Sequence, residues 1–316
     1  MKRILTILLL FAAAVSAAAV EPYAVVTVPV ANLREEPRHG AELMSQGVMG
    51  TPMTVRSRTG EWLAVTLPDG YDGYMIANSV ALMDSAAFDS WRTSPRACVD
   101  VRDTGMRLSP SADAPVVSPL QLDDVVTICD TVDGGKWLHV ALPDGRDGFL
   151  PSADAKEFLP FGSGAPADVR AASIIRRGKE ILGQEYLWGG TSIKGNDCSG
   201  FTRILFQSEG TYLPRDAWQQ ALAGKAVAAE ELLPGDLVFF SNAKGRVNHV
   251  GIYIGDGLMM HCSGRVRIDR LFGESDHSDG IQRYPGRPSA FRRVLSETPL
   301  ESDTKANTLY FTNFSK

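Results

Sequence analysis

The chain has 316 residues, which is more than one ordinary domain needs and suggests two or three domains. Its hydrophobic content of 44% and charged content of 22% are typical of a globular protein, so the composition argues against a largely disordered chain. The formal net charge of −5 gives no basis for nucleic-acid binding, because that function needs concentrated positive charge.

The first residues have the pattern of a secretory signal peptide. A basic start, Met-Lys-Arg, precedes an uncharged apolar run over Ile4–Val15, and small residues follow over Ser16–Ala19. The run is short for a membrane span, so we expect a cleaved signal peptide over residues 1–19, with an uncleaved anchor as the alternative. No other segment is long and apolar enough to span a membrane. We therefore expect an exported protein, periplasmic or extracellular, with no membrane span after cleavage.

Residues 22–84 and 96–158 form two copies of a degenerate repeat. Trp62 and Trp137 are 75 residues apart, and Leu67 and Leu142 keep the same offset, which indicates a duplication. Each copy consists of short runs of Val, Ile, Thr and Leu broken by Pro, Gly and Asp, a pattern typical of short strands and tight turns. We predict two small β-barrels, joined by a linker over residues 90–95.

The repeat resembles bacterial SH3 domains. Its first copy carries three typical segments in order, Asn32–Pro37, Trp62–Val65 and Asp69–Tyr74, and the second copy carries their counterparts. Two of the four cysteines, Cys98 and Cys129, fall in the second copy. The sequence leaves open whether they form a disulfide or are separate thiols.

After a Gly/Ser/Pro-rich linker over residues 161–167 the pattern changes to one that mixes helices and strands. Residues 169–182 and 199–208 have the features of helices, while 236–240 and 250–254 have the apolar runs of buried strands. Helices followed by strands are an α+β order, so we expect one α+β domain over residues 167–296. We assign no function to the polar tail over residues 297–316.

Cys198 is the best candidate for a nucleophile. Asn196 or Asp197 can cap a helix, and Cys198 then falls in the first turn of that helix. The partial positive charge of a helix N-terminus favours thiolate over thiol, so we expect a lowered pKa for this cysteine. Its neighbours are Asp, Ser and Gly, which are unsuited to a purely structural, buried cysteine.

A nucleophilic cysteine needs a base, and two of the five histidines flank a Gly-Asp-Gly turn. Pairing the two strands about Gly255 sets His249 directly opposite His261 on one face, which requires an odd loop or a bulge. With a two-residue loop, His249 would face Cys262 instead. Because strand residues alternate between faces, we expect Cys262 to point into the core. A further histidine, His277, lies in a predicted loop and is a weak candidate for a substrate contact.

Five ordered blocks resemble the NlpC/P60 family of papain-like cell-wall peptidases. They are Gly183–Gly190, Asp197–Phe201, Leu213–Asp216, Leu233–Phe240 and Asn248–Gly255. The resemblance implies Cys198 as nucleophile, His249 as general base and His261 as the residue that orients the base, the role of Asp or Asn in other triads. It also implies that Tyr186 lies near the nucleophile as a candidate oxyanion donor. It requires no metal or cofactor. The expected fold is therefore a papain-like α+β domain preceded by two small SH3-like β-barrels.

Members of this family mostly cleave the bond between γ-D-glutamate and a diamino acid in peptidoglycan stem peptides. Members with two SH3-like domains resemble enzymes that act on freed muropeptides with an N-terminal L-alanine, so we expect that activity on peptidoglycan-derived peptides, in a monomer. The residues implied to contact substrate, including two from the first SH3-like domain, are Asp197, Ser199, Asp216, Ala217, Trp188, Glu42 and Tyr71.

Three other functions remain open. One is a hydrolase of intact peptidoglycan that uses its SH3-like domains as wall anchors. Another is a different papain-like reaction, that of an amidase or an acyl transferase. The third is a non-catalytic wall-binding module, which the intact set of Cys198, His249 and His261 argues against.

Overall fold

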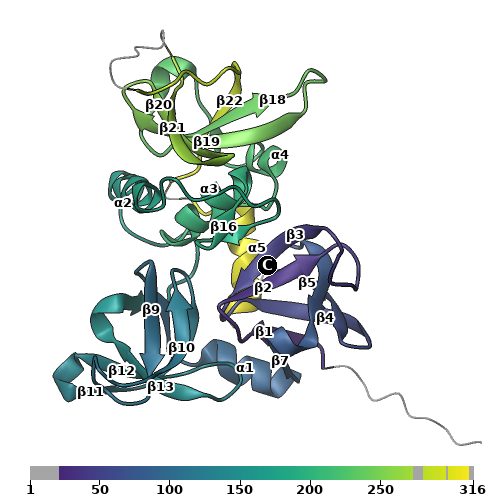
Figure 1. Cartoon of the computed structure of the whole chain (residues 1–316), viewed down its shortest axis with the longest axis vertical. Coiled ribbons are helices and arrows are strands. Elements are labelled where there is room, and N and C mark those ends of the chain that lie inside the picture. Colours follow the sequence, from purple (N-terminus) through teal and green to yellow (C-terminus); the bar gives the residue numbers. More distant parts are fainter. Residues whose placement is uncertain (1–20, 273–279, 297, 313–316) are drawn as a thin grey trace, which may run out of the picture.

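The structure is a computed structural model that describes residues 21–272, 280–296 and 298–312. The predicted signal peptide and His277 lie outside the described residues. Two sheet-rich parts lie side by side, and a part that mixes helices and strands lies across one end of both (Figure 1).

The first part is a seven-stranded antiparallel sheet with the strand order β3-β2-β6-β5-β4-β1-β7. Its core consists of alternate residues from these short strands, among them Leu33, Met53, Leu63 and Met75. The strands are β1 (Tyr23–Val26), β2 (Val30–Arg34), β3 (Leu43–Val48), β4 (Pro52–Thr59), β5 (Trp62–Thr66), β6 (Asp72–Ile76) and β7 (Val80–Met83).

The second part repeats this topology strand for strand, in the order β10-β9-β13-β12-β11-β8-β14. The duplication predicted from the 75-residue offset therefore agrees with the arrangement of the strands. The strands are β8 (Arg96–Val99), β9 (Asp103–Arg107), β10 (Val116–Gln121), β11 (Val125–Val132), β12 (Trp137–Ala141), β13 (Asp147–Pro151) and β14 (Ala155–Glu157).

Neither sheet closes into the barrel that we predicted, because the strands at the two ends of each order do not pair with each other. In the first sheet the outer edge of β3 is occupied by another part of the chain. The backbone N–H of Gln46 donates to Thr191 Oγ1 (3.1 Å), which itself donates to the Gln46 carbonyl (3.0 Å). Arg215 Nε donates to the Met44 carbonyl (2.9 Å). The edge groups that a closed barrel would use are thus satisfied by the α+β part.

The predicted linker between the two sheets is largely helical. Helix α1 (Ser85–Thr93) begins after Asp84, whose side chain accepts a hydrogen bond from the Ala87 N–H (2.8 Å). Phe88 and Trp91, three residues apart, are both buried on one face. The prediction missed this helix because it relied on composition and not on the cap and the apolar spacing.

Cys98 and Cys129 do not form a disulfide. Cys98 is buried in β8 opposite Val125, whereas Cys129 is exposed four residues further along β11. Four strand residues span about 13 Å, which exceeds the Cα separation of a disulfide.

The third part is the predicted α+β unit. Its sheet has the order β17-β22-β18-β19-β20-β21, and helices pack against its strands. The predicted helices and strands are all present, with bounds shifted by one to three residues. The helices are α2 (Ala167–Glu180), α3 (Cys198–Gln207) and α4 (Ala217–Gln220). The strands are β15 (Thr191–Ser192), β16 (Gly195–Asn196), β17 (Lys225–Ala226), β18 (Leu237–Ser241), β19 (Val247–Gly255), β20 (Leu258–Ser263), β21 (Arg265–Arg270) and β22 (Pro288–Arg293).

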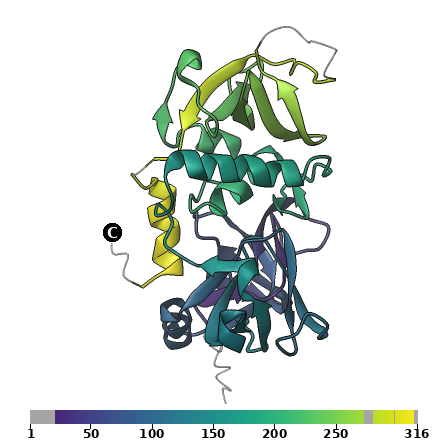
Figure 2. The ribbon, with the colours of Figure 1, turned by 90° about the vertical axis from the view of Figure 1, so that its left-hand side faces the viewer.

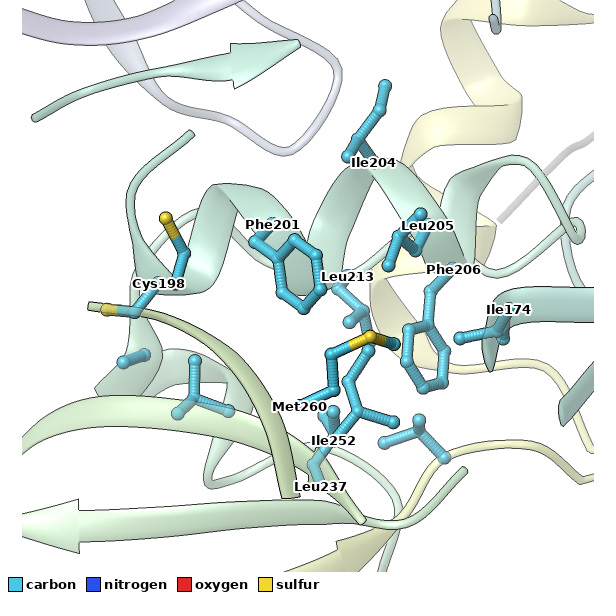
Figure 3. Packing of buried hydrophobic residues seen from close by; sticks show 14 of the residues in the cluster. Ile174, Cys198, Phe201, Ile204, Leu205, Phe206, Leu213, Leu237, Ile252 and Met260 are labelled. Atoms are coloured by element: carbon cyan, nitrogen blue, oxygen red, sulfur yellow. The ribbon is translucent and has the colours of Figure 1, made fainter. Parts of the chain in front are cut away.

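Helix α3 is the central element of this unit. Figure 3 shows Phe201 and Leu205 on α3 facing Ile252 and Met260 from the sheet, with Cys198 at the start of the helix. Each of these four apolar side chains is at most 2% exposed, so their burial contributes roughly 1.5–3 kcal/mol apiece. The core therefore fixes the position of the helix that carries Cys198.

The polar tail contains a helix, α5 (Glu301–Tyr310), for which we made no prediction. It lies along the junction of the three parts (Figure 2). Its Asp303 accepts hydrogen bonds from the Tyr212 N–H (2.6 Å) and the Leu300 N–H (2.8 Å), and Asn307 exchanges two hydrogen bonds with the Phe161 backbone. Buried Tyr310 packs against aromatic residues of the other parts. Within the described residues, no helix is long and apolar enough to cross a membrane.

Candidate active site

Cys198 is the first residue of α3, as predicted. Asp197 is the N-cap, and its Oδ1 accepts a hydrogen bond from the Gly200 N–H (2.7 Å). The same carboxylate is held by the guanidinium of Arg215, at 2.5 and 3.2 Å. Asp197 and Arg215 are both buried, so this bidentate ion pair fixes the start of the helix and the position of Cys198.

The expected low pKa of Cys198 is wrong. Burial raises the pKa of its thiol to about 11, and the neighbouring Asp197 carboxylate acts in the same direction. The N–H groups of Val250 and Ser199 and the cation of Arg215 act oppositely and are outweighed. Desolvation of a thiolate in this site therefore exceeds the effect of the helix N-terminus, and the thiol needs a base to ionise.

His249 and His261 lie on the same face, but they are not directly opposite each other. Strands β19 and β20 pair Ile252 with Met260, and continuing that register sets Gly251 opposite His261. The pairing shifts between Tyr253 and Gly255, so the hairpin contains a bulge, one of the two irregularities that placing both histidines on one face was expected to require. The two imidazoles meet diagonally, with His249 Nε2 and His261 Nδ1 2.8 Å apart.

Asp269 extends this pair into a chain of three groups. It lies on β21, and its Oδ2 is 3.1 Å from His261 Nε2 and 3.0 Å from Arg267. Although burial acts to raise the pKa of Asp269, its hydrogen bond and electrostatic interaction with His261 and the charge of Arg267 hold that pKa below its ordinary value. Strand alternation puts Asp269 on the same face of β21 as Arg267, the residue that lies opposite His261 on β20. Asp269 could therefore have been found from the sequence.

The charge on Asp269 fixes the protons of both rings. An ionised carboxylate only accepts, so His261 donates from Nε2 and its Nδ1 has a free lone pair. His249 then donates from Nε2 to that lone pair, which leaves His249 Nδ1 unprotonated as the basic nitrogen. Burial and the neighbouring His261 lower the pKa of His249 to about 3, so it is neutral at physiological pH.

Tyr284 is a contact that the sequence pattern gave no means to find. Its ring stacks on His249 with centroids 5.4 Å apart and meets the edge of His261 at 5.1 Å. It comes from the segment before β22, with no regular spacing from either histidine. Cys262, in contrast, is where we predicted it: buried, with its Sγ directed at the Asn196 carbonyl (3.2 Å).

A cleft of about 440 Å³ opens at Cys198. Among the described residues, every predicted site residue except His249 and His261 lines it. Val247 and Asn248, which precede His249 in the chain, also line it. The thiol is held close to β19, because the Val250 N–H points at it. Burial and the proximity of Cys198 raise the pKa of Tyr186, so the phenol keeps its proton and can donate. Additional lining residues are Glu35, Met44, Arg215, Trp218, Asn242 and Arg246.

The first sheet supplies one wall of the cleft. Trp188 Nε1 donates to Glu42 across the gap between the two parts (2.7 Å), and Tyr71 donates to Asp216 Oδ1 at 3.4 Å. Trp218 Nε1 donates to the other oxygen of Asp216 (3.2 Å). Asp216 thus has two neutral donors and no cationic partner within the part of the chain that the structure describes.

Ala217 follows Asp216 at the start of α4 and lines the cleft without a polar side-chain atom. Arg215 is more than the simple neighbour of Asp216 that its position suggests, because it joins Asp197, Ser199 and the first sheet. In the described ranges, no group of His, Cys, Asp and Glu side chains is arranged to hold a metal ion.

A buried cysteine at a helix N-terminus, a histidine on the adjacent sheet and a cleft at the thiol define a cysteine hydrolase of papain-like type. Residues 183–279 match the NlpC/P60 family, and residues 33–80 match the SH3 domain of bacterial dipeptidyl-peptidases. The chain belongs to the NlpC/P60 family and is a cysteine peptidase.

Similar proteins support that membership over most of the chain. A γ-D-glutamyl-L-lysine dipeptidyl-peptidase of Bacillus cereus is 32% identical over 263 residues, 77% of this chain and 75% of the relative. A Bacillus subtilis protein of the same name is 48% identical over 93 residues, 29% of this chain and 31% of its own. The crystal structure of an NlpC/P60 family protein from Bacillus cereus superposes with a TM-score of 0.72 at 25% identity, covering 87% of this chain and all of the other.

Proposed function

We propose that this protein cleaves the amide bond between γ-D-glutamate and a diamino acid in short peptidoglycan stem peptides with a free N-terminal L-alanine. The activity for which these two relatives are named supports the choice of this bond. The observation that carries the choice of a short, free peptide is the wall of the cleft built by Glu42 and Tyr71 of the first sheet.

The proposed chemistry is acyl transfer in two steps. As the Cys198 sulfur attacks the γ-carbonyl of D-glutamate, its proton passes to Nδ1 of His249. The resulting imidazolium protonates the departing amine, and a thioester forms. Water then gives a proton to His249 and attacks the thioester, which releases the acid and restores the thiol. The raised pKa of Cys198 keeps its thiol protonated before the reaction. The proton therefore moves to His249 as the sulfur attacks the carbonyl.

The second histidine and Asp269 support the charge that forms on His249. His261 accepts from His249, and the negative charge of Asp269 lies one ring further away. Tyr186 is proposed to donate to the oxyanion, since it lines the cleft and remains protonated.

The acidic end of the cleft suits an ammonium group. Asp216 has only neutral hydrogen-bond donors, and Glu42 and Glu35 lie in the same wall. A peptide still joined to glycan through its N-terminus has no ammonium there and would meet the first sheet. We propose that Asp197 and Ser199, beside the nucleophile, help to position the γ-D-glutamyl unit, and that Trp188 and Ala217 shape its surroundings.

We further propose that residues 1–19 direct export, that the second sheet is also SH3-like, and that the protein acts as a monomer. Cell-wall substrates are found outside the cytoplasm, which supports export.

The proposal is tested by offering purified enzyme L-Ala-γ-D-Glu-diamino acid tripeptide, the same peptide acetylated at its N-terminus, and intact sacculi. We expect release of L-Ala-γ-D-Glu from the free tripeptide only, and none with the Cys198→Ala variant. Cleavage of sacculi without cleavage of the tripeptide would instead favour a hydrolase of intact wall. No cleavage of either substrate by the folded wild type would reject the activity.

A further inference from the structure

The cleft is lined by side chains of both charge signs. Glu35, Glu42 and Asp216 gather where the first sheet meets the α+β part, while Arg246 lines the cleft at the turn between β18 and β19. The other cation in the cleft wall, Arg215, is fully engaged by Asp197. Arg246 is therefore the cation of this wall that is available to a ligand.

Arg246 has no acidic partner among the described residues and is exposed on the turn. The turn itself is well ordered by hydrogen bonds. The Asn242 side chain accepts from the backbone N–H groups of Lys244 (3.0 Å) and Arg246 (3.1 Å), and the Asn242 N–H donates to the Arg246 carbonyl (2.9 Å). The backbone of Arg246 is thus held in place, while its guanidinium has no ion-pair partner among the described residues.

The position of Arg246 relates it to the leaving group. It precedes His249 by three residues, a span of about 10 Å in extended chain. A bulge at this end of β19, where Phe240 pairs with His249 and Ser241 with Val247, leaves Asn248 unpaired, and the consecutive residues 246–248 line the cleft. Because His249 protonates the departing amine, the residue that carries this amine lies beside this segment.

We infer that Arg246 binds a free carboxylate on the departing diamino acid and so selects peptides that end, or branch, in a carboxylate at that residue. The inference rests on the proposed function. The carboxylate is either the α-carboxylate of a tripeptide or the second carboxylate of a diaminopimelate-type residue, and the chemistry is the same for both. The acidic residues of the cleft then bind the amine of the peptide, and Arg246 binds its carboxylate.

The test compares wild type with Arg246→Gln on four peptides, L-Ala-γ-D-Glu followed by L-lysine, L-lysine amide, diaminopimelate or diaminopimelate α-amide. The matched control is Lys244→Gln, which removes a cation from the same turn but not from the cleft wall. If the α-carboxylate is the ligand, we expect Arg246→Gln to raise KM for the two free acids roughly three- to tenfold, with kcat nearly unchanged. If the second carboxylate is the ligand, Arg246→Gln should instead raise KM for both diaminopimelate peptides. Lys244→Gln should match wild type throughout.

Equal KM values for wild type and Arg246→Gln on all four peptides would overturn the role of Arg246 and leave the proposed function intact. A fifth peptide, with D-isoglutamine in place of D-glutamate, tests whether Arg246 instead binds the carboxylate of the glutamyl unit. Loss of the Arg246 effect on that peptide alone would assign the carboxylate to the glutamyl unit and reject the inference. If the wild type cleaves none of the peptides, the proposed function itself fails, and this inference fails with it.

Discussion

At the scale of single residues, the active site depends on a chain of side chains that runs from His249 through His261 to Asp269. In the proposed mechanism, only His249 exchanges protons with the thiol and the substrate amine. His261 is fully buried and acts through its hydrogen bonds. We therefore expect a larger loss of kcat for His249→Ala than for His261→Ala. The comparison requires matched folding, checked by circular dichroism. Equal losses in two well-folded variants would contradict this order.

Asp269 should matter for proton placement more than for folding. Asp269→Asn keeps the size of the side chain but removes its charge, and its amide can donate to His261, which would reverse the donor and acceptor roles in both rings. We expect kcat to fall roughly 10- to 100-fold, a smaller loss than for His249→Ala. Steady-state kinetics at constant thermal stability measure this effect. Unchanged kcat would show that the chain does not require the charge.

The buried position of His249 predicts an unusual dependence on pH. A base must be unprotonated to accept the thiol proton, and burial lowers the pKa of His249 from 6.5 to about 3. Activity should therefore persist as pH falls through 6.5, with kcat/KM declining only as pH approaches 3. The His261→Ala variant, which lacks the neighbouring ring, should lose activity at higher pH than wild type. Profiles of kcat/KM from pH 4 to 8 provide the test. An acid limb at 6.5 in wild type would disagree with it.

At the scale of elements, the start of α3 is held by close packing as well as by its cap. A Cβ at Gly200 would lie 1.9 Å from the Gly190 carbonyl oxygen, in the loop that also carries Trp188. That contact involves backbone on both sides, which cannot move aside as a flexible side chain can. The glycine therefore lets the loop and the helix of the nucleophile approach each other.

Gly200→Ala should consequently destabilise the protein by about 2 kcal/mol and reduce activity. The measurement is urea unfolding followed by tryptophan fluorescence, with kcat/KM measured in parallel. Gly40→Ala is the control, because its Cβ would meet only the Arg38 side chain at 3.4 Å. Two variants of equal stability would mean that the loop adjusts to the added methyl group.

At the scale of the whole molecule, the cleft exists only while the first sheet is docked on the α+β part. The contact includes a buried ion pair, Arg203 with Asp69, at 2.5 Å, and the hydrogen bonds of Gln46 with Thr191. Arg203 also donates to Tyr212, which lies in the aromatic cluster with α5. The tail helix thus supports the docking of the parts that enclose the substrate.

Removing Asp69 should weaken this docking. Asp69→Ala leaves the buried Arg203 without its counter-charge, a change that costs about 3 kcal/mol in comparable sites. Tyr71, two residues away, would lose its position over Asp216, so we expect KM for the tripeptide to rise more than kcat falls. Asp72→Ala is the control, since Asp72 is exposed and its ion pair with Arg56 is at the surface. Limited proteolysis reports loosening of the first sheet. Identical kinetics for the two variants would show that docking does not depend on this pair.

Much of the site could be predicted from local sequence. The cap at Asp197, the position of Cys198 on α3 and the shared face of His249 and His261 all follow from helix capping and strand alternation. These rules act between neighbours in the chain. They cannot supply the register of a hairpin with a bulge, and so they set His249 opposite the wrong residue.

The sequence by itself determined the position of Cys198 at a helix N-terminus, the shared face of the histidine pair, the duplicated sheets and the α+β order, because each is encoded in short-range spacing. The tertiary structure alone decided the rest. Burial of Cys198 and His249 depends on atoms brought from distant segments, so the direction of both pKa shifts was beyond a local pattern. The covered edge of the first sheet, the contribution of Asp269 and the position of Arg246 in the wall of the cleft likewise depend on which distant surfaces meet.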